Sequence, residues 1–160
     1  IVLNGVSKAY SMTGWRIGYA AGPQPLIAAM KKIQSQSTSN PASISQVAAQ
    51  AALEGDQQCV KDMVKAFKIR HDYMVKALNN IDGIECLAGD GTFYLFPDFS
   101  DIQAKLGCAT DTDLAEKLLE AGVALVPGSA FGTPGHMRIS FATSDENLHK
   151  SIERLKDAAK

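Results

Sequence analysis

The run from Asn4 to Pro23, NGVSKAYSMTGWRIGYAAGP, constrains this chain more than any other stretch. Three aliphatic residues, Ile1 to Leu3, precede it and predict the end of a buried strand, since they leave no polar face. Lys8 follows the Asn4-Gly5 pair in a turn of small and hydroxyl residues, and Arg16 comes next in an apolar, glycine-flanked frame. A second short strand is expected over residues 17–21. The sequence therefore predicts two strands joined by a loop that presents a lysine and an arginine.

A lysine and an arginine in such a loop suit one kind of chemistry. A lysine amine forms imines once desolvation or a neighbouring cation lowers its pKa. An arginine offers a rigid fork of donors that meets a phosphate through two hydrogen bonds. Lys8 and Arg16 together suit the binding of pyridoxal phosphate. From spacing alone the alternative stays open that Lys8 is a surface lysine and Arg16 a structurally paired arginine.

The run GVSKAYSMTGWRIG, Gly5 to Gly18, resembles the pyridoxal-phosphate attachment signature of the class I aminotransferases. The wider run to Pro23 is similar to the bacterial-type aspartate aminotransferase subgroup, and this similarity continues to the C-terminus. The resemblance implies an α/β fold, namely the C-terminal part of a fold-type I pyridoxal-phosphate-dependent transferase. That part comprises the end of the large-domain sheet and an α+β small domain.

The resemblance also implies roles for residues in and near the loop. Lys8 is the catalytic residue that holds the cofactor covalently, and Arg16 binds its phosphate. The family often has a serine three positions before the lysine that helps to hold the phosphate. Here that residue is Gly5, so the contact is lost or passes to Ser7 or to a backbone group.

A polar tract, Gln34 to Ser43, reads as a loop that breaks at Asn40-Pro41. In related aminotransferases a Ser-Asn-Pro motif here crosses the dimer interface towards the partner's cofactor phosphate, and Ser39 and Asn40 match it. In the other aspartate aminotransferase subgroup an arginine five positions before the Asn-Pro pair binds the distal carboxylate of the substrate. Ser35 occupies that position here, so a dicarboxylic substrate would need a cation from elsewhere.

Arg138 lies in an alternating strand that places it on the same face as Ser140. By pattern alone it is a surface residue or an ion-pair partner, but the frame VPGSAFG…MRISFA resembles the family segment whose arginine binds the substrate α-carboxylate. Phe93 and Tyr94 match a family stretch that lines the substrate side of the pocket. Core packing is the equally open alternative for these two rings.

The hydrophobic pattern divides the chain near residue 55. Residues 1–55 are expected to belong to the large cofactor-binding domain, and residues 56–160 to form a small α+β domain entered through a long amphipathic helix from Gln57 to Asn80. His71 is expected on the solvated charge face of that helix. Thr110 and Asp113 have capping-box spacing. Further elements are expected as helices near 25–33, 43–54, 110–121 and from Ser144 onward, and as strands in 84–87, 92–97, VALVPG and HMRISFA.

Composition excludes several classes. A net charge of −1 provides no basic field for nucleic acid or anionic lipid, and no apolar run is long enough for a membrane span. Cys59, Cys86 and Cys108 are widely spaced without metal-ligand pairs, which indicates free thiols, no metal site and a cytoplasmic location. Since the family lysine lies well past the middle of the polypeptide, we expect the C-terminal portion of a longer enzyme.

The function implied by the resemblance is a ping-pong transamination between an amino acid, with aspartate as the leading candidate, and a 2-oxo acid such as 2-oxoglutarate. A homodimer is expected, and the chain alone is expected to be inactive, because the Asp that pairs with the pyridine nitrogen would lie upstream. Two alternatives stay open. One is a non-catalytic folded or dimerisation fragment, and the other is a different fold-type I enzyme such as a β-lyase.

Overall fold

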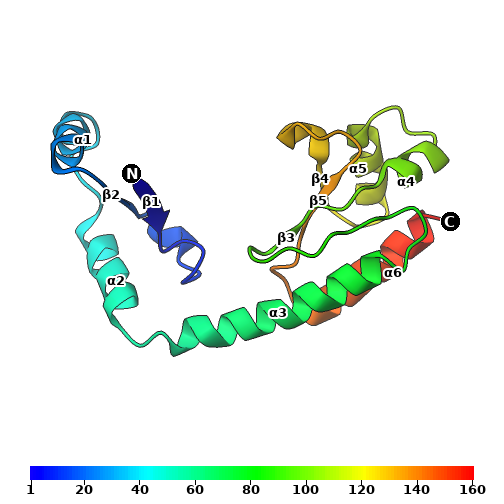
Figure 1. The fold of residues 1–160 in the computed structure, drawn as a ribbon, viewed down its shortest axis with the longest axis horizontal. Coiled ribbons are helices and arrows are strands. Elements are labelled where there is room, and N and C mark those ends of the chain that lie inside the picture. Colours follow the sequence, from blue (N-terminus) through cyan, green and yellow to red (C-terminus); the bar gives the residue numbers. More distant parts are fainter. The chain divides into compact units, whose positions relative to one another are not determined.

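The computed structural model describes all residues from 1 to 160, and they form two compact units, Ile1–Val64 and Lys65–Lys160. The division falls within α3 (Gln58–Leu78), the long helix that the amphipathic pattern predicts (Figure 1). The assignment of residues 1–55 and 56–160 to a large and a small domain stays a prediction. No helix of the chain combines the length and the apolar character that a membrane span requires.

The first unit begins with two short antiparallel strands, β1 (Val2–Gly5) and β2 (Gly18–Ala21), paired from Val2↔Ala21 to Gly5↔Gly18. A 3₁₀ turn, η1 (Thr13–Trp15), lies in the loop between them. Both strands agree with the sequence. In this chain Ile1, Val2 and Leu3 are 66%, 61% and 74% exposed. The sheet has only these two strands, which leaves most of the surface of these aliphatic residues exposed.

Two helices of the first unit, α1 (Gln24–Ser37) and α2 (Ser43–Glu54), lie between β2 and α3 in the chain (Figure 1). Pro25 lies in the first turn of α1, where its missing N–H costs nothing. The polar residues after Ile33, predicted as a loop, instead continue α1 to Ser37. Glutamine and serine on an exposed face do not end a helix, and the break comes only near Asn40-Pro41, where the residue before a proline disfavours the helical conformation.

The second unit is built around a three-stranded antiparallel sheet in the order β3-β5-β4. Its strands are β3 (Tyr94–Leu95), β5 (Met137–Ser140) and β4 (Val126–Pro127), and η2 (Gly128–Phe131) follows β4. Three further helices surround the sheet, α4 (Ser100–Lys105), α5 (Asp111–Glu120) and α6 (Asp145–Ala158). The core is apolar, and its largest fully buried side chains are Phe99, Phe141, Met74, Leu78, Ile102, Leu114, Leu118, Met137 and Leu155.

The starts of α5 and α6 follow the sequence signals closely. Thr110 and Asp113 form the predicted capping box, with Thr110 Oγ1 accepting from Asp113 N–H at 3.1 Å and Asp113 Oδ2 accepting from Thr110 N–H at 2.8 Å. Ser144 caps α6 as expected. The helix α6 runs beside the second half of α3 (Figure 1), where Arg70 Nε donates to Asp145 Oδ1 at 2.7 Å.

The hairpin predicted between residues 84–87 and 92–97 does not form as expected. Only Glu85 pairs with Asp98, and β3 has two residues. The side-chain amide of Asn79 explains the difference, because it donates to Cys86 C=O and accepts from Cys86 N–H, both at 2.9 Å. Cys86 therefore bonds to a helix end instead of a strand partner, and a wide loop replaces the tight turn.

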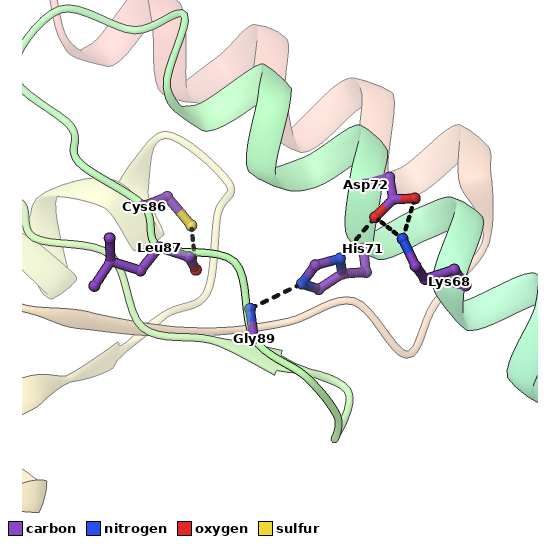
Figure 2. A network of polar contacts seen from close by, with 6 residues as sticks. All are labelled: Lys68, His71, Asp72, Cys86, Leu87 and Gly89. Atoms are coloured by element: carbon purple, nitrogen blue, oxygen red, sulfur yellow. Dashed lines mark hydrogen bonds and ion pairs between the residues drawn. The ribbon is translucent and has the colours of Figure 1, made fainter.

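His71 corrects another expectation, since only 9% of it is exposed. Its Nε2 accepts the Gly89 backbone N–H at 3.1 Å, so the ring proton lies on Nδ1 and is donated to Asp72 Oδ1 at 3.0 Å (Figure 2). Hydrogen bonds from Lys68 and then from His71 hold the pKa of Asp72 below its ordinary value. His71 also meets the Phe141 ring edge-on at 5.9 Å. The histidine thus ties α3 to the loop that leads into β3.

Candidate active site

The loop between β1 and β2 is closed by a pair of glycines. A Cβ added at Gly5 would lie 3.1 Å from Ile17 O and 3.3 Å from the Cα of Gly18, which is tighter than ordinary van der Waals contact. The glycine that replaces the family's serine therefore lets the two strands approach closely. Beyond it the loop turns on the buried Val6, whose carbonyl accepts the N–H of Tyr10 at 3.3 Å.

Lys8 and Ser7 lie in this turn. Lys8 is exposed and Ser7 is half-buried. The Lys8 carbonyl accepts the Ser11 N–H at 3.1 Å, which folds the backbone tightly around the lysine. The amine therefore projects from a compact loop rather than from a helix or a strand.

Side chains further along the loop attach it to the segment that enters α3. Tyr10 Oη donates to Gln57 Oε1 at 2.7 Å, and Ser11 Oγ donates to Met63 Sδ at 3.5 Å. Gln57 is itself held, because its Nε2 donates to the carbonyls of Ala52 at 3.0 Å and Gly55 at 2.7 Å. The loop that carries the lysine is thus positioned by polar contacts within the first unit.

Arg16 adopts the left-handed conformation, with φ 50° and ψ 50°, at the end of η1. Its Nη1 donates to Thr13 O at 2.9 Å, and the outer edge of the guanidinium remains exposed. Ser39 has a φ of 67°. Such a conformation costs a residue other than glycine on the order of 1–3 kcal/mol and concentrates at functional sites. Two of the residues predicted to meet a phosphate therefore share an unusual backbone geometry.

Ser39 and Asn40 lie on the exposed connection between α1 and α2. Their hydrogen bonds are local, with Ser39 N–H donating to Gln34 O at 3.0 Å and Asn40 Nδ2 donating to Pro41 O at 2.8 Å. Both side chains remain accessible to an external group. Their predicted role towards a partner's cofactor is a proposal.

Arg138 belongs to the second unit, on β5. Burial alternates along this strand, so Arg138 and Ser140 share a face as the sequence predicts. The guanidinium carbon lies 4.6 Å from the centre of the Tyr94 ring and 4.7 Å from the centre of the Phe131 ring. Phe93 packs against the core, with its ring centre 4.4 Å from that of Tyr94. Core packing of Phe93 is thus seen, whereas its role towards a substrate stays a prediction.

The chain matches known proteins along almost its whole length. Residues 1–155 match the family described as aminotransferase class I and II. The chain belongs to this family. It is 53% identical to the aspartate/prephenate aminotransferase of Nitrosomonas europaea over 97% of this chain and 41% of that protein. It is 50% identical to the aspartate aminotransferase of Geobacillus stearothermophilus, again over 97% of this chain and 40% of the relative.

Solved structures show the same relationship. The aspartate aminotransferase from Rhizobium meliloti aligns with a TM-score of 0.90 and 46% identity over 99% of this chain and 41% of that one. The aromatic aminotransferase from Pyrococcus horikoshii aligns with a TM-score of 0.88 and 38% identity over 97% of this chain and 41% of that one. The fold class is therefore confirmed as fold-type I. The chain spans about 40% of the length of these relatives.

Two residues that the sequence did not mark as functional, Phe131 and Asp111, contribute to the structure around Arg138. Phe131 stands in the frame VPGSAFG, but its position over Arg138 depends on the turn η2 and is not visible in the sequence. Asp111, read only as part of a helix start, is buried and accepts the Ser129 N–H at 2.7 Å. No sequence signal marks this contact, because it joins the first turn of α5 to a turn far along the chain.

Proposed function

We propose that this chain is part of a pyridoxal-phosphate-dependent aminotransferase that moves an amino group between an amino acid, in the first instance aspartate, and a 2-oxo acid such as 2-oxoglutarate. One observation carries the proposal: an exposed lysine and a left-handed arginine lie on the same tightly closed loop in a member of the aminotransferase class I and II family. The names of the relatives support aspartate as the first substrate to test.

The residues of the loop fit the cofactor by their chemistry. Lys8 offers an exposed primary amine, which can attack an aldehyde carbon. Arg16 uses one guanidinium nitrogen on Thr13 O, which leaves other donors for the phosphate oxygens. Pyridoxal phosphate, when bound, supplies the aldehyde and an electron-withdrawing ring. Ser7, Ser39 and Asn40 are proposed to add hydroxyl and amide groups around the phosphate, the latter two across a homodimer interface.

In the proposed reaction Lys8 would hold the cofactor through its side-chain amine. The Lys8 amine would also serve as the general base that removes the substrate Cα proton and as the general acid that then donates this proton. Arg138 binds the substrate α-carboxylate through two parallel hydrogen bonds and so orients the Cα–H bond. Phe93 is proposed to line the substrate pocket.

The chain alone is expected to be inactive, because Lys8 and Arg16 form one side of the site and the chain spans about 40% of its relatives. We also propose that the enzyme works in the cytoplasm as a homodimer. The three free cysteines are consistent with a reducing compartment.

The test uses the enzyme that contains this chain. Borohydride reduction followed by peptide mass spectrometry should place the cofactor on Lys8, and Lys8→Ala should remove the visible absorbance of bound cofactor and nearly all turnover. Lys31→Ala, which removes an exposed lysine of α1, is the matched control and should retain both. Cofactor trapped on another lysine would refute the assignment of Lys8.

Product analysis separates the remaining alternatives. Transamination requires a 2-oxo acid as acceptor, whereas a β-lyase releases ammonia and a keto acid without one. Turnover of aspartate that depends on 2-oxoglutarate supports the proposal. Keto acid formation without an acceptor would favour the β-lyase, and no cofactor binding at all would favour a non-catalytic fragment.

A further inference from the structure

We propose that Tyr94 and Phe131 are positioning residues whose rings hold the Arg138 guanidinium and thereby set how tightly the enzyme binds its carboxylate substrate. The two rings are called the aromatic clamp below. The inference rests on the proposed function and goes beyond it, because it assigns a role to two residues that need not touch the reacting atoms.

The first observation is how differently the arginines of the second unit are held. Arg70 donates to the carboxylate of Asp145 at 2.7 Å, and Arg154 donates to the carbonyl of Gly122 at 2.8 Å. Arg138, half-buried on the sheet, has rings at 4.6 Å and 4.7 Å and no oxygen partner. Its five N–H donors therefore have no acceptor within the protein and can bind an anionic group of a ligand.

The second observation is where the rings lie. Both ring centres lie within 5 Å of the guanidinium carbon and no acceptor lies on its N–H groups, so a carboxylate can accept two parallel hydrogen bonds from them. A free arginine side chain samples many rotamers, and ordering it when substrate binds weakens affinity. The aromatic clamp orders Arg138 beforehand by cation–π attraction, without placing a competing carboxylate beside it.

The third observation is that each ring is anchored independently. Tyr94 sits on β3, where it pairs with Ser140 of β5. Phe131 ends η2 and meets the Phe96 ring edge-on at 5.9 Å and 90°. A backbone hydrogen bond fixes the start of η2, because Gly128 N–H donates to His136 O at 2.7 Å.

The exposure of Phe131 argues against a role in core packing alone. Nearly half of its surface, 48%, is open to solvent, whereas the core phenylalanines Phe99 and Phe141 are 1% exposed. A ring that is only about half-buried gains less from burial than a core phenylalanine does. Its contact with the Arg138 cation supplies a reason for a ring at this place.

The kinetic test compares ring-removing with ring-keeping substitutions in the enzyme that contains this chain. Phe131→Leu and Tyr94→Leu should raise KM for both the amino acid and the 2-oxo acid about 2- to 30-fold, the range expected for one cation–π contact, while kcat changes by less than about twofold. Phe131→Tyr and Tyr94→Phe keep a ring face and should restore the KM of the parent enzyme.

Tyr73→Leu is the matched control, because the Tyr73 ring lies 4.4 Å from the His149 ring and does not contact Arg138. It should leave KM unchanged even if it lowers stability. A merely structural role for the clamp would reduce the active fraction, and therefore kcat, at unchanged KM. That pattern, or an unchanged KM in both leucine variants, would overturn the proposal.

A second readout does not depend on activity. In the ¹⁵N-labelled chain, the Arg138 Nε–H signal should be displaced by the ring currents of Tyr94 and Phe131. Phe131→Leu should move it towards the position of a solvated arginine, and an identical signal in both proteins would overturn the clamp. If the parent enzyme fails to transaminate, the proposed function fails, while this spectrum still decides whether the rings hold Arg138.

Discussion

The buried carboxylate of Asp111 provides a stringent test of how the fold supports the candidate site. Asp111 is the first residue of α5, and only 4% of it is exposed. Its Oδ2 accepts the Ser129 backbone N–H at 2.7 Å within η2, the turn that ends in Phe131. Asp111→Ala removes this acceptor and leaves a backbone N–H without a partner.

The expected loss of stability follows from two contributions. A hydrogen bond to a charged group contributes about 1.5–3 kcal/mol. A negative charge in the first turn of a helix contributes about 0.3–1 kcal/mol through the helix dipole. Asp111→Ala should therefore lower the free energy of unfolding by about 2–4 kcal/mol. Asp111→Asn keeps an oxygen acceptor and should cost roughly half as much.

The same carboxylate predicts a pH dependence. Burial raises the pKa of Asp111, but hydrogen bonds from Ser129 and from the Thr112 and Asp111 backbone outweigh it and hold this pKa below the ordinary value of 3.8. A depressed pKa in the folded state means that the stabilisation is present above the unfolded pKa and is lost as pH falls through the folded value. The difference in unfolding free energy between the parent and Asp111→Ala should thus be largest near neutral pH and shrink below about pH 4.

Urea unfolding followed by circular dichroism at pH 7 and pH 3, together with hydrogen exchange of the Ser129 amide, measures both effects. Asp157→Ala is the control, because Asp157 is exposed on α6 and pairs only with the exposed Lys160 at 2.7 Å. It should change stability by less than about 0.5 kcal/mol. A loss below that size for Asp111→Ala, or an equal loss at both pH values, would refute the reasoning.

Three further predictions concern other parts of the chain. In the enzyme that contains this chain, Arg16→Ala should weaken retention of the cofactor. In the same enzyme, Arg138→Ala should lower kcat/KM about 30- to 1,000-fold, which corresponds to about 2–4 kcal/mol. Unchanged turnover of the amino acid would mean that Arg138 has only a structural role. His71→Ala should cost about 0.5–1.5 kcal/mol in urea unfolding, because it removes the acceptor of the Gly89 backbone N–H, and should speed exchange of the Gly89 amide specifically. Burial raises the pKa of the Cys86 thiol to about 11, so iodoacetamide should label the exposed Cys59 long before Cys86 in the native chain, and equal rates would contradict this.

Most helices and their caps were predictable from the sequence, because their signals are local. Asp113 and Ser144 mark helix starts through hydrogen bonds within three residues. The burial of His71 was predictable too, since it shares the helical face of Phe67 and Met74 at spacings of four and three residues. The prediction that His71 lies on the solvated charge face of the helix is therefore wrong.

Other features depend on contacts that no local pattern contains. The Asn79 side chain forms hydrogen bonds with both the N–H and the C=O of Cys86. Residues 84–87 therefore do not form a β-ladder, although their pattern predicts a strand. The short helix α4 follows Asp98, whose Oδ1 accepts the Ser100 N–H at 2.8 Å, and it has too few residues for a periodic signal. Such elements depend on hydrogen bonds from single side chains to backbone groups. Secondary-structure propensity predicts them poorly.

In the candidate site, too, the sequence predicts some features and not others. The identities of Lys8, Arg16 and Arg138 are carried by motifs, because imine chemistry and bidentate anion binding each require one particular side chain. The motifs do not predict which contacts hold these three side chains in position. Arg16 is held by a left-handed backbone, whereas Arg138 is held by two rings brought together by the β3–β5 register and the turn η2. A substitution of the supporting residues should therefore alter binding constants while leaving the motif, and the reaction it implies, intact.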